Sequence, residues 1–492
     1  MITFIVSIIL LFLGYFIYGK FVERVFGADP KRPTPAYKLR DNVDYMPMNT
    51  FKAYMIEFLD IAGLGPVFGA ILGAAYGPVA FLWIILGGIF GGAVHDYFSG
   101  MMSVRQNGES IAEVVGKWLG ISAKQFMRFF TVFFMILVGA AFMMGPAKIL
   151  TVMIGSVKIF GYELTGKTLL WSWVGIIFLY YFLATLLPID KIIGRIYPIF
   201  GLALLFMALG IGGVLLIHGH AIPEVTISNL HNMKTNAEHY PIFPLLFITI
   251  SCGALSGFHS TQAPLMARTI KNEKHGRFVF YGAMLTETFV ALIWAAAAMV
   301  FFHGGVKGLN DFLTQQGGNP AKFVADISSA WLGKVGGLLA VLGVIAAPIT
   351  TGDTALRSAR LIVADFTKLK QDKMLNRLVI TIPIFLIALA LLFIKFDALW
   401  RLMFWFNQIL ATIVLWAITV YLAKKHKLYV ITLIPAIFMT AVVVAYLFVA
   451  QETLAMSKTL GYTVALLTSL VITALFFYFH ITKYSKQEIV ED

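Results

Sequence analysis

The chain has 492 residues, of which 59% are hydrophobic and only 13% are charged. Soluble domains carry roughly a quarter charged residues, so this composition excludes an ordinary soluble protein and predicts a protein that crosses a membrane many times. The single cysteine excludes a disulfide framework and a zinc site based on several cysteines. The sequence contains no glycine-rich phosphate loop, which argues against a pump driven by ATP.

Apolar runs of about 20 residues predict membrane-spanning helices. About thirteen such runs follow one another, and the first is an uncleaved anchor because its basic residues follow the apolar stretch. The fold class is therefore an all-α polytopic membrane protein. The predicted spans are Met1–Gly19, Ala53–Ala75, Val79–Ser103, Phe126–Ile154, Leu169–Leu187, Ile196–Ile217, Ile242–Ala267, Phe278–His303, Leu332–Thr351, Leu378–Ile394, Ala398–Ala423, Tyr429–Ala450 and Gly461–Ile481.

Basic residues concentrate in alternate loops between these spans. When the loop after the first span is placed in the cytoplasm, most of the 38 lysine and arginine residues lie on that side, as the positive-inside rule requires. This pattern predicts a multi-pass protein of the inner (plasma) membrane, with its N-terminus outside and its C-terminus in the cytoplasm. It also accounts for the net charge of +13 without a nucleic-acid partner.

Two predicted spans contain residues that interrupt a helix in mid-membrane. The second span has Gly63, Gly65 and Pro66, and the seventh has Gly253 and Gly257, followed by a polar run. Irregular backbone at this depth is tolerated where it is buried in protein or lines a cavity, and a corresponding pair of interrupted spans points to a transporter binding site. A simple kink is the alternative for each. The expected substrate-binding residues are Gly63, Gly65, Pro66, Gly257, His259, Ser260, Thr261, Gln262, Asn407 and Gln408.

The two interrupted spans are five spans apart, and an odd repeat unit makes the second copy run in the opposite direction. This spacing predicts a LeuT-like inverted five-plus-five repeat with two discontinuous helices. The predicted units are an N-terminal helix and cytoplasmic loop (1–52), a first repeat (53–217), a second repeat (242–423) and two C-terminal helices with a cytoplasmic tail (424–492).

Ionisable residues from four distant spans are predicted to share one depth in the membrane. Such residues are costly in a bilayer and by default mark function. Besides His259, they include Glu57, Asp60, His95, Asp96 and Asp353. The residues expected to couple an ion or a proton are Asp60, His95, Asp96, Thr350, Thr351 and Asp353.

Several of these residues also have structural interpretations. His95 and Asp96 could pair two helices instead of relaying a proton, and Asp353 could anchor the end of its span beside Arg357. Asn407 and Gln408 could join helices, and Glu287 could have a structural instead of a functional role. Cys252 is expected to be a small packing residue, and a metal centre from His95, Asp96 and His259 is a minor alternative.

The breaks also suggest how a carboxylate and a cation would be bound. Backbone N–H groups at Gly65–Phe68, or after His259, would face a substrate carboxylate. Unwound backbone at Ala62–Leu64, with the hydroxyls of Thr350 and Thr351, would supply oxygen ligands for Na⁺.

Several motifs together resemble the carbon starvation A family of inner-membrane transporters. They are "EFLDIAGLGPVFGAILGAAYG", "AVHDYFSGMMSVRQNGES", "SGFHSTQAPLMAR", "TGDTALRSARL" and "FWFNQILATIVLW". The resemblance implies peptide uptake, or for some members pyruvate uptake with protons. It also implies membership of the amino acid–polyamine–organocation superfamily, whose fold is the five-plus-five inverted repeat.

The expected function is secondary active import of a small carboxylate-bearing nutrient, with short peptides first and pyruvate as the alternative. The driving force would be an H⁺ or Na⁺ gradient, and no other cofactor is expected. The partners are the substrate and the lipid bilayer, and the sequence leaves the oligomeric state open. The chain is not expected to be an enzyme, since it lacks the motifs of a hydrolase, and a passive channel is the alternative of another class.

Overall fold

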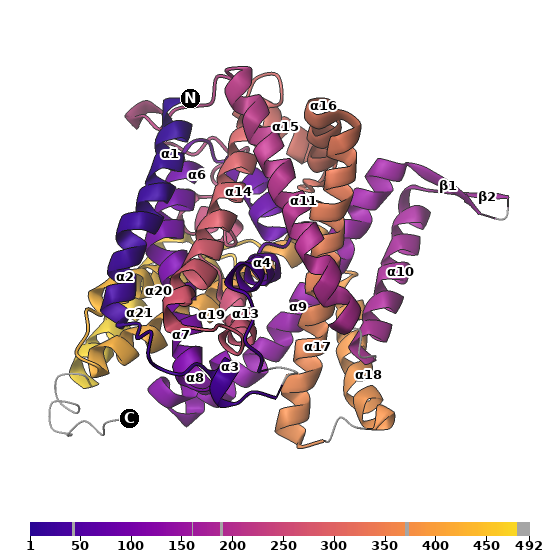
Figure 1. Cartoon of the computed structure of the whole chain (residues 1–492). Coiled ribbons are helices and arrows are strands. Elements are labelled where there is room, and N and C mark those ends of the chain that lie inside the picture. Colours follow the sequence, from indigo (N-terminus) through magenta and orange to yellow (C-terminus); the bar gives the residue numbers. More distant parts are fainter. Residues whose placement is uncertain (42–44, 160, 187–189, 370–372, 480–492) are drawn as a thin grey trace.

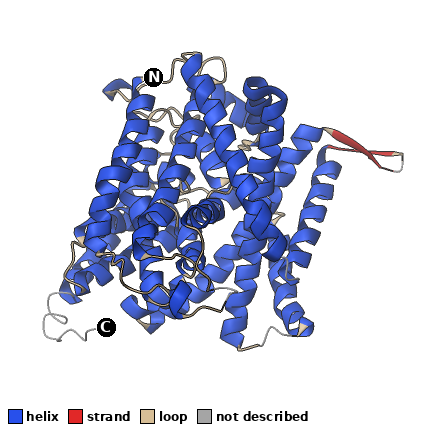
Figure 2. Cartoon of the chain, viewed as in Figure 1, coloured by secondary structure: helices blue, strands red, loops and turns tan. Residues whose placement is uncertain are grey.

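The computed structural model describes residues 1–41, 45–159, 161–186, 190–369 and 373–479, which form a bundle made almost entirely of helices (Figures 1 and 2). Within this part of the chain, 11 helices are long and apolar enough to cross a membrane, or 12 if the bent pair Thr50–Ile61 and Gly65–Ala74 is one span. This agrees with a polytopic membrane protein. The predicted C-terminal tail beyond residue 479 lies outside the described residues.

The first half of the chain contains eleven α-helices and one hairpin. The π-helical segments Gly14–Tyr18, Gly65–Gly69 and Trp83–Gly92 continue or precede helices. The α-helices are α1 (Ile2–Leu13), α2 (Gly19–Phe26), α3 (Pro35–Lys38), α4 (Thr50–Ile61), α5 (Ala70–Ala74), α6 (Val79–Leu82), α7 (Ala93–Arg105), α8 (Ile111–Leu119), α9 (Ile121–Ile154), α10 (Gly166–Leu186) and α11 (Asp190–Ile217).

The described residues of the second half form helices joined by loops, with no strand among them. Its π-helical segments are Arg277–Tyr281 and Val341–Ala346, and short 3₁₀ turns occupy Ile227–Asn229 and Glu273–His275. The α-helices are α12 (Ile242–Thr249), α13 (Gly257–Ala267), α14 (Gly282–Val300), α15 (Val306–Gln315), α16 (Ala321–Ala340), α17 (Ala347–Thr367), α18 (Met374–Leu391), α19 (Phe396–Lys424), α20 (Val430–Val449) and α21 (Lys458–Tyr478).

The helices differ in how much protein surrounds them. The span that contains α14 is 83% buried, whereas α21 is 22% buried, so α14 lies at the centre of the bundle and α21 at its edge. A hairpin of strands β1 (Ser156–Ile159) and β2 (Tyr162–Thr165), paired antiparallel, projects from the bundle (red in Figure 2). The sequence predicts only a loop for this segment, between the fourth and fifth spans.

One set of loops meets at the end of the bundle where α1 begins (Figure 1). The backbone N–H of Thr3 donates to the carboxylate of Glu224 at 2.7 Å. The side chain of Asn310 in α15 donates to the carbonyl of Ala75 at 2.9 Å. All four residues belong to segments that were predicted to lie on the outer side.

A second set of loops meets at the opposite end. Arg105 forms an ion pair with Glu273 at 3.0 Å, and the hydroxyl of Thr34 donates to the carbonyl of Ile270 at 2.7 Å. These residues belong to segments predicted to be cytoplasmic. The structure therefore separates the loops into the two groups that the alternation of basic residues predicts.

The ninth predicted span, Leu332–Thr351, was placed correctly at its start and wrongly at its end. α16 is kinked at Gly333, whose backbone is non-helical, so a new helical segment begins beside Leu332. From there the helix continues through a π-helical segment into α17 and ends only where Lys368 adopts a left-handed conformation. The residues after Gly352 include no proline or glycine to end the helix before that point. Asp353 is consequently inside a helix and not at the end of a span.

Candidate substrate and ion site

The two predicted breaks exist, and they touch each other. α4 ends at Ile61 and the helix resumes at Gly65, with a bend of 56°. In the other segment, α12 and α13 are separated by the non-helical residues 250–256. A Cβ atom on Gly65 would overlap the side chain of Cys252, and one on Gly253 would lie 3.9 Å from the Cα of Pro66. Backbones can approach this closely only because glycine has no side chain.

Asn407 of α19 holds the second break in shape. Its amide nitrogen donates to Ser251 Oγ at 2.7 Å and to Ser256 Oγ at 3.0 Å, and its oxygen accepts from the backbone N–H of Phe258 at 2.7 Å. These bonds join both ends of the break to α19 and cap the first turn of α13.

Gln408 acts in the same region. Its amide nitrogen donates to the carbonyls of Phe247 at 3.2 Å and Leu255 at 2.9 Å. Asn407 and Gln408 thus connect α19 to the second break, as the structural alternative for these residues predicted. Substrate binding by either residue remains a prediction.

Two N–H groups of the first break that were predicted to face a carboxylate, those of Val67 and Phe68, already have acceptors. The N–H groups of Val67 and Phe68 bond to the carbonyl of Leu64 at 3.2 and 2.8 Å, and that of Phe258 bonds to Asn407. The placement of a helix start after His259 was wrong, because α13 begins at Gly257 and includes His259. The N–H groups of Val67 and Phe68 are occupied by a carbonyl of their own segment, and that of Phe258 is occupied by the side chain of Asn407. The sequence reveals neither kind of bond.

A buried line of ionisable side chains runs beside the breaks. α7 and α13 pack side by side (Figure 1), and His259 Nδ1 lies 2.7 Å from Asp96 Oδ2. The other oxygen of Asp96 lies 2.8 Å from Nδ1 of His95. All three side chains are at most 1% exposed. The structure thus brings together three of the predicted residues from two distant spans.

Three further residues extend this line. His259 Nε2 lies 3.2 Å from Glu287 Oε2 of α14, and the thiol of Cys252 also interacts with His259. Glu57 of α4, completely buried, interacts electrostatically with Asp96 and His259. Both Glu287 and Cys252 were given structural interpretations from the sequence. For Glu287, however, an isolated carboxylate in mid-span was a signal of a functional role.

The remaining polar residues of the second break bond locally. Ser260 Oγ and Thr261 Oγ1 donate to the carbonyls of Gly257 and Phe258, each at 2.6 Å, and the Gln262 amide donates to Thr261 at 2.9 Å. They lie in the first turns of α13, and the first two hydroxyls donate to its own backbone.

The predicted coupling residues of α17 lie in other surroundings. Thr350 and Thr351 donate to the carbonyl of Ala347 in their own helix, at 2.6 and 3.1 Å. Asp353 accepts from Tyr180 at 3.4 Å and lies 3.7 Å from Arg357. The structure therefore places Asp353 in a group with α10, apart from the ion pairs of Asp96 and His259.

Asp60 occupies the last turn of α4, one residue before the helix ends at Ile61. It is 7% exposed and interacts electrostatically with Glu57. The first break consequently has two carboxylates on its α4 side.

A cavity of about 420 Å³ opens at the end of the bundle that was predicted to face outward. Tyr76, Thr249 and Trp400 line its inner part, and Lys234 and Arg401 line it as well. Thr249 is the last residue of α12, so the cavity reaches the second break. Its basic side chains suit an anion.

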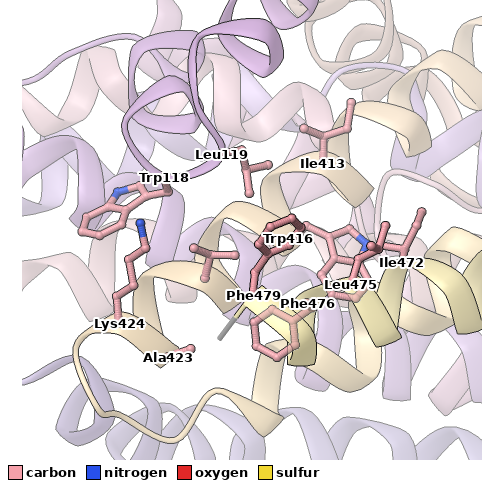
Figure 3. A pocket seen from close by; sticks show the side chains of 11 residues that line it. Trp118, Leu119, Ile413, Trp416, Ala423, Lys424, Ile472, Leu475, Phe476 and Phe479 are labelled. Carbon is pink, nitrogen blue, oxygen red and sulfur yellow. The ribbon is translucent and has the colours of Figure 1, made fainter. Parts of the chain in front are cut away.

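An apolar groove of about 480 Å³ lies elsewhere, between α8, α19 and α21 (Figure 3). Trp118, Trp416 and Phe476 line it, with Lys424 at its edge. Its walls are almost entirely apolar, and none of the predicted site residues is among the described residues that line it. This groove therefore suits lipid chains better than a polar solute.

With this geometry established, comparison with known proteins gives the family. The sequence profile described as "Carbon starvation protein CstA" matches residues 1–161 and 149–337. The chain belongs to this family. The predicted resemblance is confirmed.

Three relatives show how similar its members are. An "Uncharacterized membrane protein" of Haemophilus influenzae is 45% identical over 341 residues, which are 61% of this chain and 91% of that protein. "Peptide transporter CstA" of Bacillus subtilis is 30% identical over 60% of this chain and 57% of that protein. "Pyruvate/proton symporter BtsT" of Escherichia coli is 28% identical over 62% of this chain and 50% of that protein.

The chain thus spans about half the length of the relatives that are named for an activity. Those names describe transporters, which agrees with the prediction of a transporter and not an enzyme.

Solved structures show a related fold. Two crystal structures of mutants of the Eremococcus coleocola manganese transporter align with TM-scores of 0.51 and 0.52 over 88% of this chain and 95% of theirs. The sequence identity is 15%, so the likeness concerns the fold alone.

Proposed function

We propose that the chain is a secondary active transporter that imports a small carboxylate-bearing nutrient, with short peptides as the first substrate class. The contact between the two helix breaks carries this proposal. It creates a place in mid-bundle where the backbone is irregular on both sides and where buried ionisable groups gather. Discontinuous helices of this kind form the sites of many secondary transporters.

The proposed architecture has thirteen spans arranged as a LeuT-like inverted five-plus-five repeat. α12 and α13 then count as one discontinuous span that begins the second repeat, as α4 and α5 begin the first. The N-terminus lies outside the inner membrane and the C-terminus in the cytoplasm. The distribution of basic residues between the two groups of loops supports this orientation.

The basic cavity supports an anionic substrate. Lys234, Lys395 and Arg401 line the same space of about 420 Å³ as Tyr76 and Trp400. This volume is within the range of small-molecule sites. A carboxylate would be attracted there before it reaches the break at Thr249.

The driving force is proposed to be a gradient of H⁺ or Na⁺. Asp60 and Asp96 are the first choice for coupling residues, because one ends the helix before the first break and the other contacts α13. His95 is proposed to support Asp96, while Thr350, Thr351 and Asp353 would act from α17.

The second candidate is a proton-coupled pyruvate symporter. The name of the Escherichia coli relative, "Pyruvate/proton symporter BtsT", favours it, and pyruvate carries the same carboxylate. The two candidates differ only in substrate and can be separated in one assay.

The test is uptake into proteoliposomes of labelled pyruvate, dipeptides and tripeptides, under separate pH and sodium gradients. We expect accumulation of one substrate class above its external concentration, abolished by an ionophore that collapses the relevant gradient. Equilibration without accumulation would indicate a passive channel and overturn the proposal.

Variants connect uptake to the site. We expect His259→Ala and Asp60→Asn each to lower the initial rate by roughly tenfold or more, since about 1.4 kcal/mol of lost coupling already corresponds to a factor of ten. Glu113→Gln is the control and should keep the wild-type rate, because Glu113 of α8 only forms ion pairs with Lys124 and Arg128 of α9. Unchanged rates in both site variants would place the site elsewhere.

A further inference from the structure

We propose that Cys252, His259 and Glu287 form a binding site for a transition-metal ion of the zinc, cobalt and iron(II) class. One ligand atom from each side chain lies within 4.8 Å of the others, and all three side chains are buried. The three come from the second break, from α13 and from α14. The inference goes beyond the proposed transport function, because the ion is a resident part of the protein and not its substrate.

The orientation of His259 is that of a metal ligand. Its Nδ1 faces Asp96 at 2.7 Å, so this nitrogen carries the proton when the imidazole is neutral. The lone pair then lies on Nε2, which is 3.2 Å from Oε2 of Glu287, and the thiol of Cys252 also contacts His259. A carboxylate that fixes a histidine in this way is the common support of a metal-binding imidazole.

The carboxyl groups around the site would suit a cation. Glu57, Asp96 and Glu287 are completely or almost completely buried. Within the described part of the chain, no lysine or arginine forms an ion pair with any of them, and histidines are their only basic partners. Buried carboxyl groups are neutral, paired or bound to a metal, and a divalent ion would stabilise the ionised form of those near His259.

The donor set selects the class of metal. Sulfur and imidazole favour zinc, cobalt or iron(II) over sodium, magnesium or calcium, which prefer oxygen. In tetrahedral sites with bond lengths of about 2.0 to 2.3 Å, ligand atoms lie about 3.3 to 3.8 Å apart. A separation of at most 4.8 Å can close to this range by side-chain rotation. Three protein ligands leave a fourth position for water.

The consequence for the fold is a cross-link at the second break. A metal ion would connect the non-helical residue Cys252 to α13 and α14, and would hold α13 against α14 while other parts move. Asp96 is then a positioning residue, which acts on the metal through His259.

The experiment uses full-length protein purified in detergent without a polyhistidine tag or metal resin. Metal content is measured after loading with Zn²⁺ or Co²⁺ and removal of free ions. The Co²⁺ form is also examined for a thiolate-to-cobalt charge-transfer band. Because Cys252 is the only cysteine of the chain, this band can come from no other residue.

We expect one equivalent of metal and the band in the wild type, and their loss in Cys252→Ser and Glu287→Gln. Asp96→Asn should keep the site but weaken its affinity by roughly 10- to 100-fold. A control with His218→Ala and His220→Ala removes the neighbouring loop histidines and should bind like the wild type. Thermal unfolding of each apo-protein verifies that the variants are folded.

Three results would overturn the proposal. The first is absence of both stoichiometric metal and the band in loaded wild type, and the second is retention of metal by Cys252→Ser and Glu287→Gln. The third is accumulation of labelled zinc inside proteoliposomes, which would make the ion cargo. None of these readouts requires uptake of peptides or pyruvate, so failure of the transport proposal would leave the metal test intact.

Discussion

Lys234, which lines the basic cavity of about 420 Å³, has an unusual environment for a lysine. Burial, reinforced by the nearby Arg401, lowers its pKa to about 8. Its ammonium group lies 5.0 Å from the ring centre of Tyr76 and 5.2 Å from that of Tyr240. A lysine with an ordinary pKa is charged at every physiological pH, whereas Lys234 loses its charge as the pH rises through about 8.

This environment predicts a pH-dependent uptake of anions. Below pH of about 8 the protonated Lys234 attracts a carboxylate, and above it the neutral amine does not. We expect uptake to fall by a factor on the order of ten as the external pH rises through this value. The pH inside the proteoliposomes is raised in parallel, so that the pH gradient across the membrane stays constant. Lys234→Gln should remove this step, and Lys307→Gln, on the exposed side of α15, should keep it. An unchanged profile in Lys234→Gln would contradict the assignment.

Single residues of the site differ in how well the sequence predicted them. His259 and Asp96 could be found because ionisable residues in a span are rare. The sequence could not show that Glu287 belongs to this group of residues, because only the folded chain shows that its side chain faces His259. The capping role of Asn407 was equally hidden, because its partners lie about 150 residues earlier in the chain.

At the scale of elements, the glycines at the first break lie where neighbouring side chains leave no room for a larger residue. Gly65 faces Cys252, and Gly63 faces the ring of Phe142, 2.7 Å from an ideal Cβ position. Any larger residue there would push the two broken segments apart.

A substitution at the contact should therefore affect both stability and transport. We expect Gly65→Ala to lower the free energy of unfolding by about 1–3 kcal/mol, as overpacking in a core does, and to reduce uptake. Gly213→Ala in α11 is the matched control, because a Cβ there meets nothing within 4 Å and alanine favours helix. Thermal unfolding in detergent and proteoliposome uptake measure the two effects. Equal behaviour of both variants would show that the contact is not tight.

The sequence predicted the existence of both discontinuous elements but not their limits. Glycine and proline marked the first break correctly at residues 62–64. In the second segment, the break lies at residues 250–256 and Pro264 is accommodated inside α13. Where this helix begins depends on Asn407 in α19, which local sequence does not reveal. The extent of α17 was also missed. The polar residues after Thr351 were interpreted as the end of a span, whereas in the structure they continue the helix.

At the scale of the whole molecule, the separation of the loops into two groups makes the orientation testable. Ser228 lies in the loop beside Glu224 and Lys31 lies in the loop beside Glu273; both are exposed. We expect Ser228→Cys to react with a membrane-impermeant maleimide in intact cells, and Lys31→Cys to react only after permeabilisation. The wild type, whose single cysteine is buried, gives the background. The reverse pattern would invert the proposed orientation.

The overall architecture was more predictable than the site because it follows from composition and spacing. Apolar length determined most spans, and basic residues determined the grouping of loops. The β1–β2 hairpin and the length of the run α16–α17 escaped prediction, because both lie where apolar length gives no information.

One amide side chain joins three segments at the end of the bundle where α1 begins. Asn310 donates to the carbonyls of Ala75 at 2.9 Å and Met233 at 3.2 Å, and accepts from the N–H of Thr235 at 3.1 Å. The end of the first discontinuous helix, the loop 218–241 and α15 are thereby fastened together, and the N–H of Met233 adds a second link by donating to the carbonyl of Tyr76 at 3.3 Å. If this end of the protein opens, these segments must either travel as one body or break the bonds at Asn310 and Met233, so this small set of bonds limits the movements available there.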